Sequence, residues 1–243
     1  MNQRDNHRLS RAMDYRETSP PPHLAGLVKA RWTLIGHGTA DAWIEQQATP
    51  DGCIEIIRRA RGRSRWNGEQ SASFVVGLVD RPQPFEISGD AAFEALRLWP
   101  WAWGIIGDIA PAALHGRWRE IPAPDFAAIE ARLSAATDLG AIGRAIIAAP
   151  SVAAMGAATG MNPRALQRWF ARHVGVPPRV FLRLLRFQKT FETLAGEDSL
   201  AGHAATQGFA DQAHMAREFR SLAGVPATTA RRRARGPFLD QSP

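Results

Sequence analysis

The chain contains 243 residues, of which 45% are hydrophobic and 22% are charged, and its net charge is +7 at pH 7. This length accommodates one large domain or two small ones, each able to bury a core. The sequence has no apolar run of about 18 residues, which a membrane-spanning helix requires. Its polar start, residues 1–16, lacks the apolar segment of a secretory signal, and its single cysteine, Cys53, excludes a disulfide framework. A cytoplasmic protein is therefore expected.

Positive charge is concentrated in the C-terminal third of the chain. Residues 1–150 contain 17 Lys and Arg against 17 Asp and Glu, whereas residues 151–235 contain 13 against 5, a net charge of +8. A surface that follows DNA phosphates requires such a concentration. A basic helical domain that is merely solvated would show the same charge, so charge alone does not separate the two interpretations.

The N-terminal part of the chain is typical of a β-rich domain. Residues 1–18 have mixed charges and no apolar pattern, which predicts a disordered arm. Residues 19–121 contain short apolar runs separated by turn residues, at spacings of roughly ten residues. The predicted strands are Leu27–Leu34, Trp43–Ala48, Cys53–Ile57, Ser73–Val79, Phe85–Ser88 and Ala92–Trp99. This pattern predicts an antiparallel sandwich or barrel, with a loop or hairpin over Arg58–Arg65.

Residues 122–150 are predicted to form a helical linker. Phe126, Ile129 and Leu133 follow helical spacing, and Asp138 is placed to cap a second helix that ends at Ala148. Two interpretations are open for this segment. Its helices form a hinge or a dimer face, or they pack on the predicted sheet.

One sequence pattern then occurs twice between Gly156 and Pro226. The first copy contains Gly156, Gly160, Leu166-Gln-Arg-Trp-Phe170 and Gly175-Val-Pro177. The second copy contains Ala204, Gly208, Met215-Ala-Arg-Glu-Phe219 and Gly224-Val-Pro226. The two phenylalanines, Phe170 and Phe219, are 49 residues apart. A repeat of this length is usually one supersecondary unit per copy.

Each copy has the features of a helix-turn-helix. In the first copy Ser151 is placed to cap a helix, Gly160 to end it in a turn, and Asn162 to cap the next helix ahead of Pro163. Apolar residues then recur at helical spacing and leave Arg and Gln on the other face. The second copy repeats this arrangement, with Ser199 and the turn at Gly208 before a cap at Asp211 and inward-facing Met215 and Phe219. Two short helices joined by a glycine turn define the motif.

A single helix is predicted to connect the two copies. Apolar residues fall near helical spacing from Pro178 to Ala195, and Gly196 is placed to end the helix. About 18 residues at 1.5 Å each give a length of about 27 Å. Such a helix would hold two recognition helices roughly 34 Å apart, which is one turn of B-DNA.

These residues together resemble the DNA-binding domain of AraC/XylS-type transcription regulators. The resemblance is carried by Leu166–Phe170, Gly175–Pro178, Phe181-Leu182, Gly208–His214, Arg217–Arg220 and Gly224-Val225. The chain departs from the family at its end, where Pro226-Ala227 and Ala230-Arg231 replace the usual Thr-Pro and aromatic residue. The β-rich part, with its turn Pro50-Asp-Gly-Cys53, resembles the cupin-like N-terminal domain of one branch of these regulators. That second resemblance implies a sensor or regulatory domain.

The resemblance implies an α+β protein with two domains. A β-rich, cupin-like barrel or sandwich over residues 19–121 would precede the linker at 122–150. An all-α domain with two helix-turn-helix units would occupy residues 151–235, followed by a tail at 236–243.

The resemblance also assigns candidate DNA contacts. Arginine binds guanine and glutamine binds adenine through paired hydrogen bonds in the major groove, whereas phosphate contacts position the protein. The expected base-reading residues are Arg164, Gln167, Arg168, Gln212, Ala213, His214 and Arg217. The expected phosphate-binding residues are Arg172, Arg186, Lys189 and Arg220. Trp169 and Phe170 are expected in the core of the domain.

The β-rich part offers little catalytic chemistry. His37 and His115 are far apart and no His-x-His pair occurs, so neither a metal nor another cofactor is expected. Cys53 is expected to be a buried structural thiol. Trp32, Trp43 and Trp99 are candidates for an effector pocket, although packing in the core would use the same side chains.

The sequence therefore predicts a sequence-specific DNA-binding transcription regulator that is not an enzyme. Its expected partner is double-stranded DNA, with a small-molecule effector, RNA polymerase and a second copy of the chain as further candidates and no membrane. One alternative is a cupin-like or DNA-repair enzyme tethered to DNA. Another is a ligand-independent regulator whose N-terminal domain only dimerises.

Overall fold

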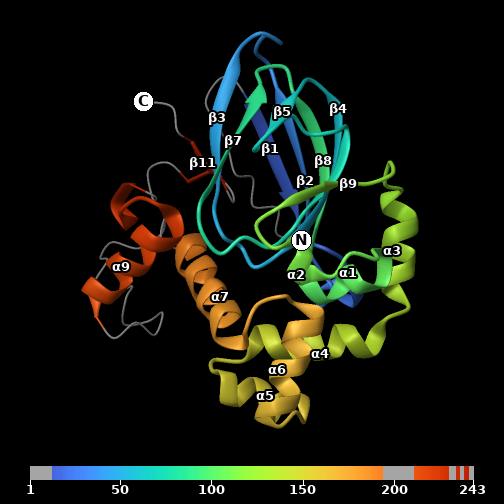
Figure 1. The fold of residues 1–243 in the computed structure, drawn as a ribbon, viewed down its shortest axis with the longest axis vertical. Coiled ribbons are helices and arrows are strands. Elements are labelled where there is room, and N and C mark those ends of the chain that lie inside the picture. The colour runs from blue at the N-terminus through green and yellow to red at the C-terminus, as the bar shows by residue number, and fades with distance from the viewer. Residues whose placement is uncertain (1–12, 194–210, 230–233, 236–237, 241–243) are drawn as a thin grey trace.

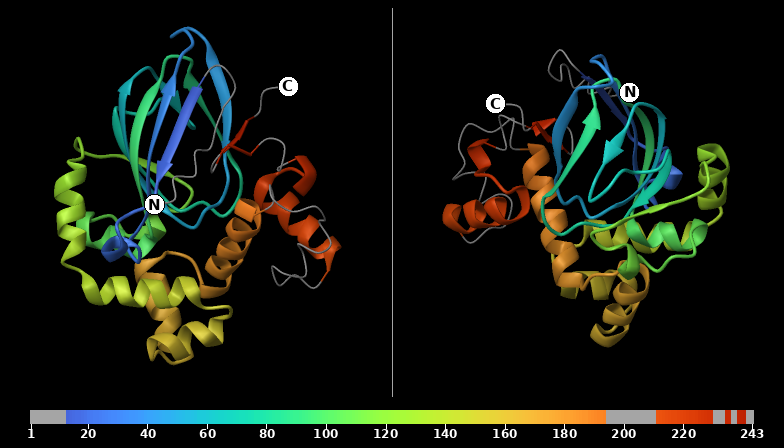
Figure 2. Two further views of the ribbon diagram at one scale, coloured as in Figure 1. Left: turned by 180° about the vertical axis from the view of Figure 1, so that it is seen from behind. Right: turned by 45° about the horizontal axis from the view of Figure 1, so that its top comes forward.

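A computed structural model describes residues 13–193, 211–229, 234–235 and 238–240. An N-terminal domain of two antiparallel sheets, here called the β-domain, is followed by a C-terminal helical region (Figure 1). The helices gather around one end of the β-domain, with α3 on one side and α7 and α9 on the other (Figures 1 and 2). The α+β class predicted from the sequence is confirmed.

The β-domain contains a six-stranded and a five-stranded sheet. In spatial order the first sheet consists of β1 (Met13–Thr18), β2 (Val28–Gly36), β8 (Ala92–Leu98), β4 (Ile54–Arg61), β6 (Ser73–Val76) and β9 (Trp118–Glu120). The second consists of β10 (Ala234–Arg235), β11 (Phe238–Asp240), β3 (Trp43–Ala48), β7 (Gln83–Ser88) and β5 (Ser64–Arg65). A single turn of 3-10 helix, Pro22–Leu24, lies between β1 and β2.

Apolar side chains pack against both faces of the six-stranded sheet. Successive side chains of a strand point to opposite faces, so alternate residues enter different surroundings. On β4, Ile54 and Ile56 join the core beneath the helices, whereas Ile57 joins a second cluster between the two sheets. On β8, Leu98 joins the first core and Phe93 the second. One sheet therefore serves two cores.

Both ends of the chain differ from the sequence prediction. The disordered arm is wrong for residues 13–18, because β1 pairs with β2 from Met13 opposite Gly36 to Thr18 opposite Arg31. Met13 and Tyr15 are buried at alternate positions of this strand. Residues 1–12 of the expected arm lie outside the described residues. In the expected tail, β11 pairs with β3 and so adds to the five-stranded sheet.

The segment before the helix-turn-helix packs on the β-domain. Its helices are α1 (Pro100–Ile106), α2 (Pro111–Leu114), α3 (Phe126–Ser134) and α4 (Thr137–Ala148). Asp125 caps α3 by accepting a hydrogen bond from Ala128 N at 3.1 Å. The cap predicted at Asp138 is wrong, because α4 begins at Thr137 and Asp138 lies in its first turn. Phe126, Leu133 and Ile146 join the core that lies between the six-stranded sheet and the helices. This favours a segment packed on the sheet over a free hinge.

The first helix-turn-helix forms where the repeat predicts it. Its helices are α5 (Val152–Thr159) and α6 (Pro163–His173). Ser151 caps α5 by accepting from Ala154 N at 3.1 Å, and Asn162 caps α6 by accepting from Ala165 N at 2.9 Å. Gly160 adopts a φ of +67° at the turn, which glycine alone adopts without strain.

The described part of the second unit is one helix. The connecting helix α7 (Pro178–Thr193) is followed by α9 (Gln212–Ala223), which Asp211 caps by accepting from His214 N at 2.6 Å. The predicted end of the connecting helix at Ala195 lies outside the described residues. The same holds for the predicted cap Ser199 and turn residue Gly208.

An aromatic cluster joins the two parts of the chain. Trp99 and Trp101 stack with ring centroids 5.7 Å apart, and the Phe181 ring of α7 packs edge-on against Trp101 at 5.7 Å. Phe170 and Trp169 of α6 lie 5.6 Å from Phe181 and 5.8 Å from Trp101 respectively. The β-domain and the helical region therefore share one core instead of being joined by a free linker.

Two hydrogen bonds add to this contact. Gln188 of α7 donates from Nε2 to the carbonyl of Pro50 at 2.6 Å, and Gln188 is buried. Gln47 of β3 donates from Nε2 to the carbonyl of Ala223 at 2.7 Å, at the end of α9. Both halves of the helical region therefore contact the β-domain.

Phe181→Ala is expected to destabilise the whole chain. Phe181 is fully buried, and a buried phenylalanine replaced by alanine typically costs about 3–5 kcal/mol. Urea unfolding followed by tryptophan fluorescence and circular dichroism should show a single transition at a lower urea concentration. Arg179→Ala, an exposed position on the same helix, is the control. Two separate transitions, with only one of them shifted, would contradict a shared core.

Candidate functional site

The outer face of α6 is polar and basic. Arg164, Gln167, Arg168 and Arg172 are all exposed and are spaced at i, i+3, i+4 and i+8, which places them on one side of the helix. The opposite side is buried through Leu166 and Phe170. The helix thus presents three arginines and a glutamine to solvent while its apolar side anchors it.

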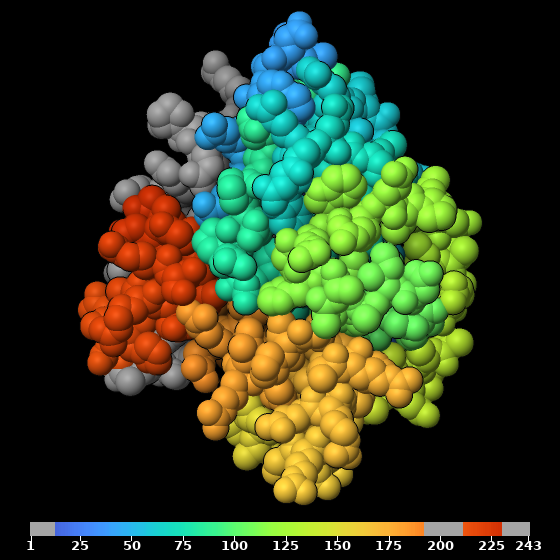
Figure 3. Space-filling model, viewed as in Figure 1, coloured from blue at the N-terminus to red at the C-terminus, as the bar shows by residue number. Residues whose placement is uncertain are grey.

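α9 has the same division. Gln212, Ala213, Arg217 and Arg220 are exposed and His214 is half-buried. Met215 and Phe219 are buried on the other side. In Figure 3, α5 and α6 project from the end of the molecule below the β-domain, and α9 forms a separate bulge on its flank. The two predicted recognition helices are therefore both at the surface.

The connecting helix contributes two of the predicted phosphate contacts. Lys189 is exposed and Arg186 is half-buried on α7. Another basic residue of α7, Arg183, forms an ion pair with Glu218 of α9 at 2.5 Å and a hydrogen bond to Ser221 at 2.9 Å. This link ties the second recognition helix to the connecting helix. Sequence reasoning missed it, because its partners are 35 residues apart.

A cavity of about 90 Å³ lies between the two sheets of the β-domain. Its walls are mainly apolar, and polar groups line part of them. The residues that line it include Trp32, Ala48, Asp51, Glu55, Trp66 and Phe85.

The structure does not bring the three predicted pocket tryptophans together. Trp32 lines the cavity. Trp43 instead lies beneath the guanidinium groups of Arg63 and Arg65, at 4.9 and 4.2 Å from its ring centroid. Trp99 belongs to the core shared with the helices. Trp66, which the sequence did not single out, lines the cavity.

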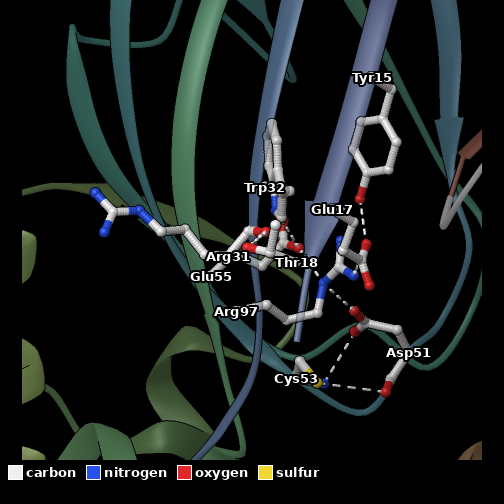
Figure 4. Close-up of polar contacts among 9 residues, drawn as sticks. All are labelled: Tyr15, Glu17, Thr18, Arg31, Trp32, Asp51, Cys53, Glu55 and Arg97. Atoms are coloured by element: carbon white, nitrogen blue, oxygen red, sulfur yellow. Dashed lines mark hydrogen bonds and ion pairs between the residues drawn. The ribbon is translucent and has the colours of Figure 1, made fainter. Parts of the chain in front are cut away.

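A largely buried polar cluster, drawn in Figure 4, borders the cavity through Asp51 and Glu55. We call it the Arg97 cluster, and its members are Tyr15, Glu17, Asp51, Glu55 and Arg97. Arg97 Nε lies 2.6 Å from Glu55 Oε1 and 3.0 Å from Asp51 Oδ2, and its Nη1 lies 2.9 Å from Glu17 Oε2. The Tyr15 hydroxyl donates to Glu17, and Trp32 Nε1 donates to Glu55 Oε1 at 3.2 Å.

Burial and charge shift the pKa values in this cluster in opposite directions. Burial raises the pKa of Glu55, and Asp51 adds to the rise although Arg97 opposes it. Burial also acts to raise the pKa of Glu17, but Arg97 and the hydrogen bond from Tyr15 outweigh it and hold that pKa below its ordinary value. Arg97 itself stays charged, because its carboxylate neighbours raise its pKa despite its burial.

Cys53 is a buried thiol at the edge of the same cluster. Its backbone N donates to Asp51 Oδ1 at 2.9 Å and its Sγ donates to the carbonyl of Asp51 at 3.5 Å. Burial, together with the nearby Asp51 carboxylate, raises the pKa of the thiol. A thiol held in its neutral form is a poor nucleophile, so the position is structural.

His37 and His115 lie apart, with His37 Nε2 at 3.0 Å from Asp14 Oδ2 and His115 Nε2 at 3.5 Å from Asp80 Oδ1. Within the residues that the structure describes, no three His, Cys, Asp or Glu side chains are grouped to hold a metal ion. None of the helices described is both long and apolar enough to cross a membrane.

Comparison with known families matches two parts of the chain. Residues 155–233 match a family described as a helix-turn-helix domain. This C-terminal segment is an AraC-type helix-turn-helix domain. Residues 16–118 match a family described as a domain of unknown function (DUF6597). The AraC-type domain thus includes most of α5 and all of α6, α7 and α9, while the second family covers most of the β-domain.

Solved structures of ToxT from Vibrio cholerae show a weak similarity. One in a P21 crystal form is 11% identical, has a TM-score of 0.43, and is matched over 89% of this chain and 96% of its own. One with bound unsaturated fatty acid is 11% identical, with a TM-score of 0.41 over 76% and 91%. Similarity at this level assigns no ligand to the present chain. No curated protein matches the chain in sequence.

The Arg97 cluster was missed from the sequence, although one indication of it is visible there. On β8, Phe93, Ala95 and Arg97 occupy alternate positions, and the first two face the interior between the sheets. A charged residue at the next inward position requires buried partners. Those partners come from β1, β4 and the loop before β4, which only the fold brings together.

Glu55→Gln is expected to gain stability relative to the native chain as the pH rises. The pKa of Glu55 is raised above its ordinary value of 4.5 in the folded chain. The folded state therefore holds the proton more tightly than the unfolded state, and this stabilisation is lost as the pH rises through the folded pKa. Urea unfolding at several pH values from 4.5 upward measures the difference.

Glu94→Gln is the matched control on the outer face of the same sheet. Burial raises the pKa of Glu94, but hydrogen bonds from Arg31 and Arg58 outweigh it and the pKa is lowered. Its carboxylate stabilises the fold above the ordinary pKa, so the variant should lose relative stability as the pH rises. The same trend with pH in both variants would contradict the assignment.

Proposed function

We propose that this protein is a sequence-specific DNA-binding transcription regulator whose β-domain senses a small-molecule effector. The observation that carries the proposal is the repeated exposed polar face of α6 and α9 within an AraC-type domain. In this view α6 and α9 are recognition helices that enter successive major grooves. RNA polymerase contact, a homodimer and a cytoplasmic location stay predictions from the sequence.

Each recognition helix would contact the bases of one major groove. Arg164, Gln167 and Arg168 of α6 would contact base edges in one major groove, because arginine and glutamine form paired hydrogen bonds with guanine and adenine. The corresponding residues of α9 are Gln212, Ala213, His214 and Arg217. The 16 residues of α7 span about 24 Å, which supports reading of two grooves about one helical turn apart.

Affinity would come mainly from phosphate contacts. The proposed phosphate contacts are Arg172, Arg186, Lys189 and Arg220, and residues 151–235 carry a net charge of +8. Each phosphate neutralised releases counterions, so binding should weaken steeply as salt rises.

The loop Thr49–Cys53 contacts both the cavity and α7, the connecting helix of the helix-turn-helix domain. Thr49, Asp51 and Cys53 line the cavity. The two residues between them face α7 instead, because the Pro50 carbonyl accepts from Gln188 and a Cβ at Gly52 would lie 3.3 Å from the Phe181 ring. A ligand that favours one position of this loop would favour one arrangement of α7. This is the physical support for an effector role.

The enzyme alternatives find less support. Cys53 is buried with a raised thiol pKa, and the described residues offer no metal cluster. A β-domain that only dimerises would not need an internal cavity that borders a charged cluster. An effector-sensing regulator accounts for the cavity, the loop and the basic faces together.

Selection of bound sequences from a random DNA duplex pool tests the proposal. We expect the native chain to enrich a site with two elements about one helical turn apart. Arg168→Ala should lose sequence preference at one element, and Arg217→Ala at the other, each at a cost of about 1–3 kcal/mol. Binding to the selected site should weaken when the salt concentration is raised.

Arg16→Ala on β1 is the matched control, because it removes one exposed positive charge outside the helix-turn-helix domain. It should leave the selected sequence unchanged. Salt-sensitive binding without any enriched sequence would overturn the proposal, since it would mean that the basic region only coats phosphates.

A further inference from the structure

The cavity between the sheets has an apolar body and a charged end. Leu34, Ile57, Phe74, Phe85, Ile87 and Phe93 form apolar walls. Asp51 and Glu55 line the cavity where it meets the Arg97 cluster. At about 90 Å³ the space is smaller than an engineered cavity of about 150 Å³ that binds benzene. An occupant therefore has a short body.

Negative charge exceeds positive charge at the charged end. Arg97 is a single cation that faces three carboxylates, Glu17, Asp51 and Glu55. The side chains of Asp51 and Glu55 are only 11% and 14% exposed, so water solvates these two carboxylates poorly. Lys29 acts on Glu17 from further away. A buried carboxylate without a full share of positive charge is costly, and a cationic ligand would remove that cost.

One observation favours an anion and is outweighed. Arg97 Nη2 is buried without a hydrogen-bond partner among the described residues, and by itself it would attract an acceptor. An anionic ligand beside it would, however, be the fourth negative group around one guanidinium. Repulsion from Asp51 and Glu55, which line the cavity directly, therefore excludes a carboxylate head group.

Two buried donors also face the interior of the β-domain. Trp66 is 6% exposed and lines the cavity, and its Nε1 has no partner in the described part of the chain. Gln46 is 3% exposed, and its Nε2 likewise has no partner there. Gln46 lies opposite Phe85, which lines the cavity, and residues directly opposite share one face of a sheet. Of the two, Trp66 lines the cavity, and its donor calls for an acceptor on the ligand.

We infer that the cavity binds a small organic cation, an amine with a short, mostly apolar body and one hydrogen-bond acceptor. Its ammonium group donates to the carboxylates of Asp51 and Glu55, which are the charge-assisted hydrogen bonds that an ammonium forms best. The Trp32 ring beside Glu55 offers an aromatic surface to the same charge. The inference rests on the proposed effector role of the β-domain.

The test compares three probes that share one ether-containing body and differ in the head group. Methoxypropylamine, methoxybutanoate and methoxypropanol are titrated into the full-length protein by calorimetry, in phosphate buffer because Tris is itself an amine. We expect the amine to bind about tenfold more tightly than the alcohol, since hydrogen bonds to charged groups are the stronger ones, and the carboxylate to bind least. Preference for the carboxylate, or equal binding of all three, would overturn the inference.

Variants locate the binding and keep the test independent of folding. Glu55→Gln and Asp51→Asn should each lower amine affinity about tenfold and leave alcohol binding largely unchanged. Glu94→Gln, on the outer face of the sheet, should bind all three probes like the native chain. Ala48→Leu fills the cavity without changing its charge and should weaken all three. If Glu55→Gln or Asp51→Asn does not fold, the comparison of the three head groups on the native chain still tests the inference.

Selection of bound DNA sequences, carried out on the same protein preparations, separates this inference from the proposed function. Sequence-specific DNA binding without amine binding would overturn the ligand class and leave the regulator intact. Amine binding without sequence-specific DNA binding would overturn the regulator and leave the ligand class. If both hold, the amine should shift affinity for the selected site in the native chain and not in Ala48→Leu.

Discussion

The two-residue period of β4 and β8 is the constraint on which the rest of the structure depends. Ile54, Ile56 and Leu98 point into the core beneath the helices, whereas Glu55 and Arg97 point between the sheets. A slip of one residue would exchange the two sets and bury charge in the aromatic core. The same register therefore fixes both the polar end of the cavity and the surface on which the helical region packs.

Because one sheet serves both cores, the cavity and the DNA reader are not mechanically independent. The loop Thr49–Cys53 contacts both directly, with alternate residues facing the cavity and α7. The aromatic cluster of Trp101 and Phe181 holds α6 and α7 against α1, the helix that follows β8.

What could be predicted from the sequence was set by local chemistry. The caps Ser151, Asn162 and Asp211 act within three residues of themselves, and the helix-turn-helix is visible because it occurs twice. β1 was missed because its two apolar residues stand among charged ones, and β11 because three residues show no period. The Arg97 cluster could not be predicted, because its members become neighbours only through strand pairing.

The pairing of β11 with β3 means that both ends of the described chain belong to the β-domain. In topological terms the AraC-type domain is an insertion within the β-domain, not an appendage to it. A single cut near residue 150 would not yield a complete β-domain, because it would remove β11 and leave β3 as an open edge. Open edges pair with one another, so a dimer of that fragment would reflect the truncation and not the native protein.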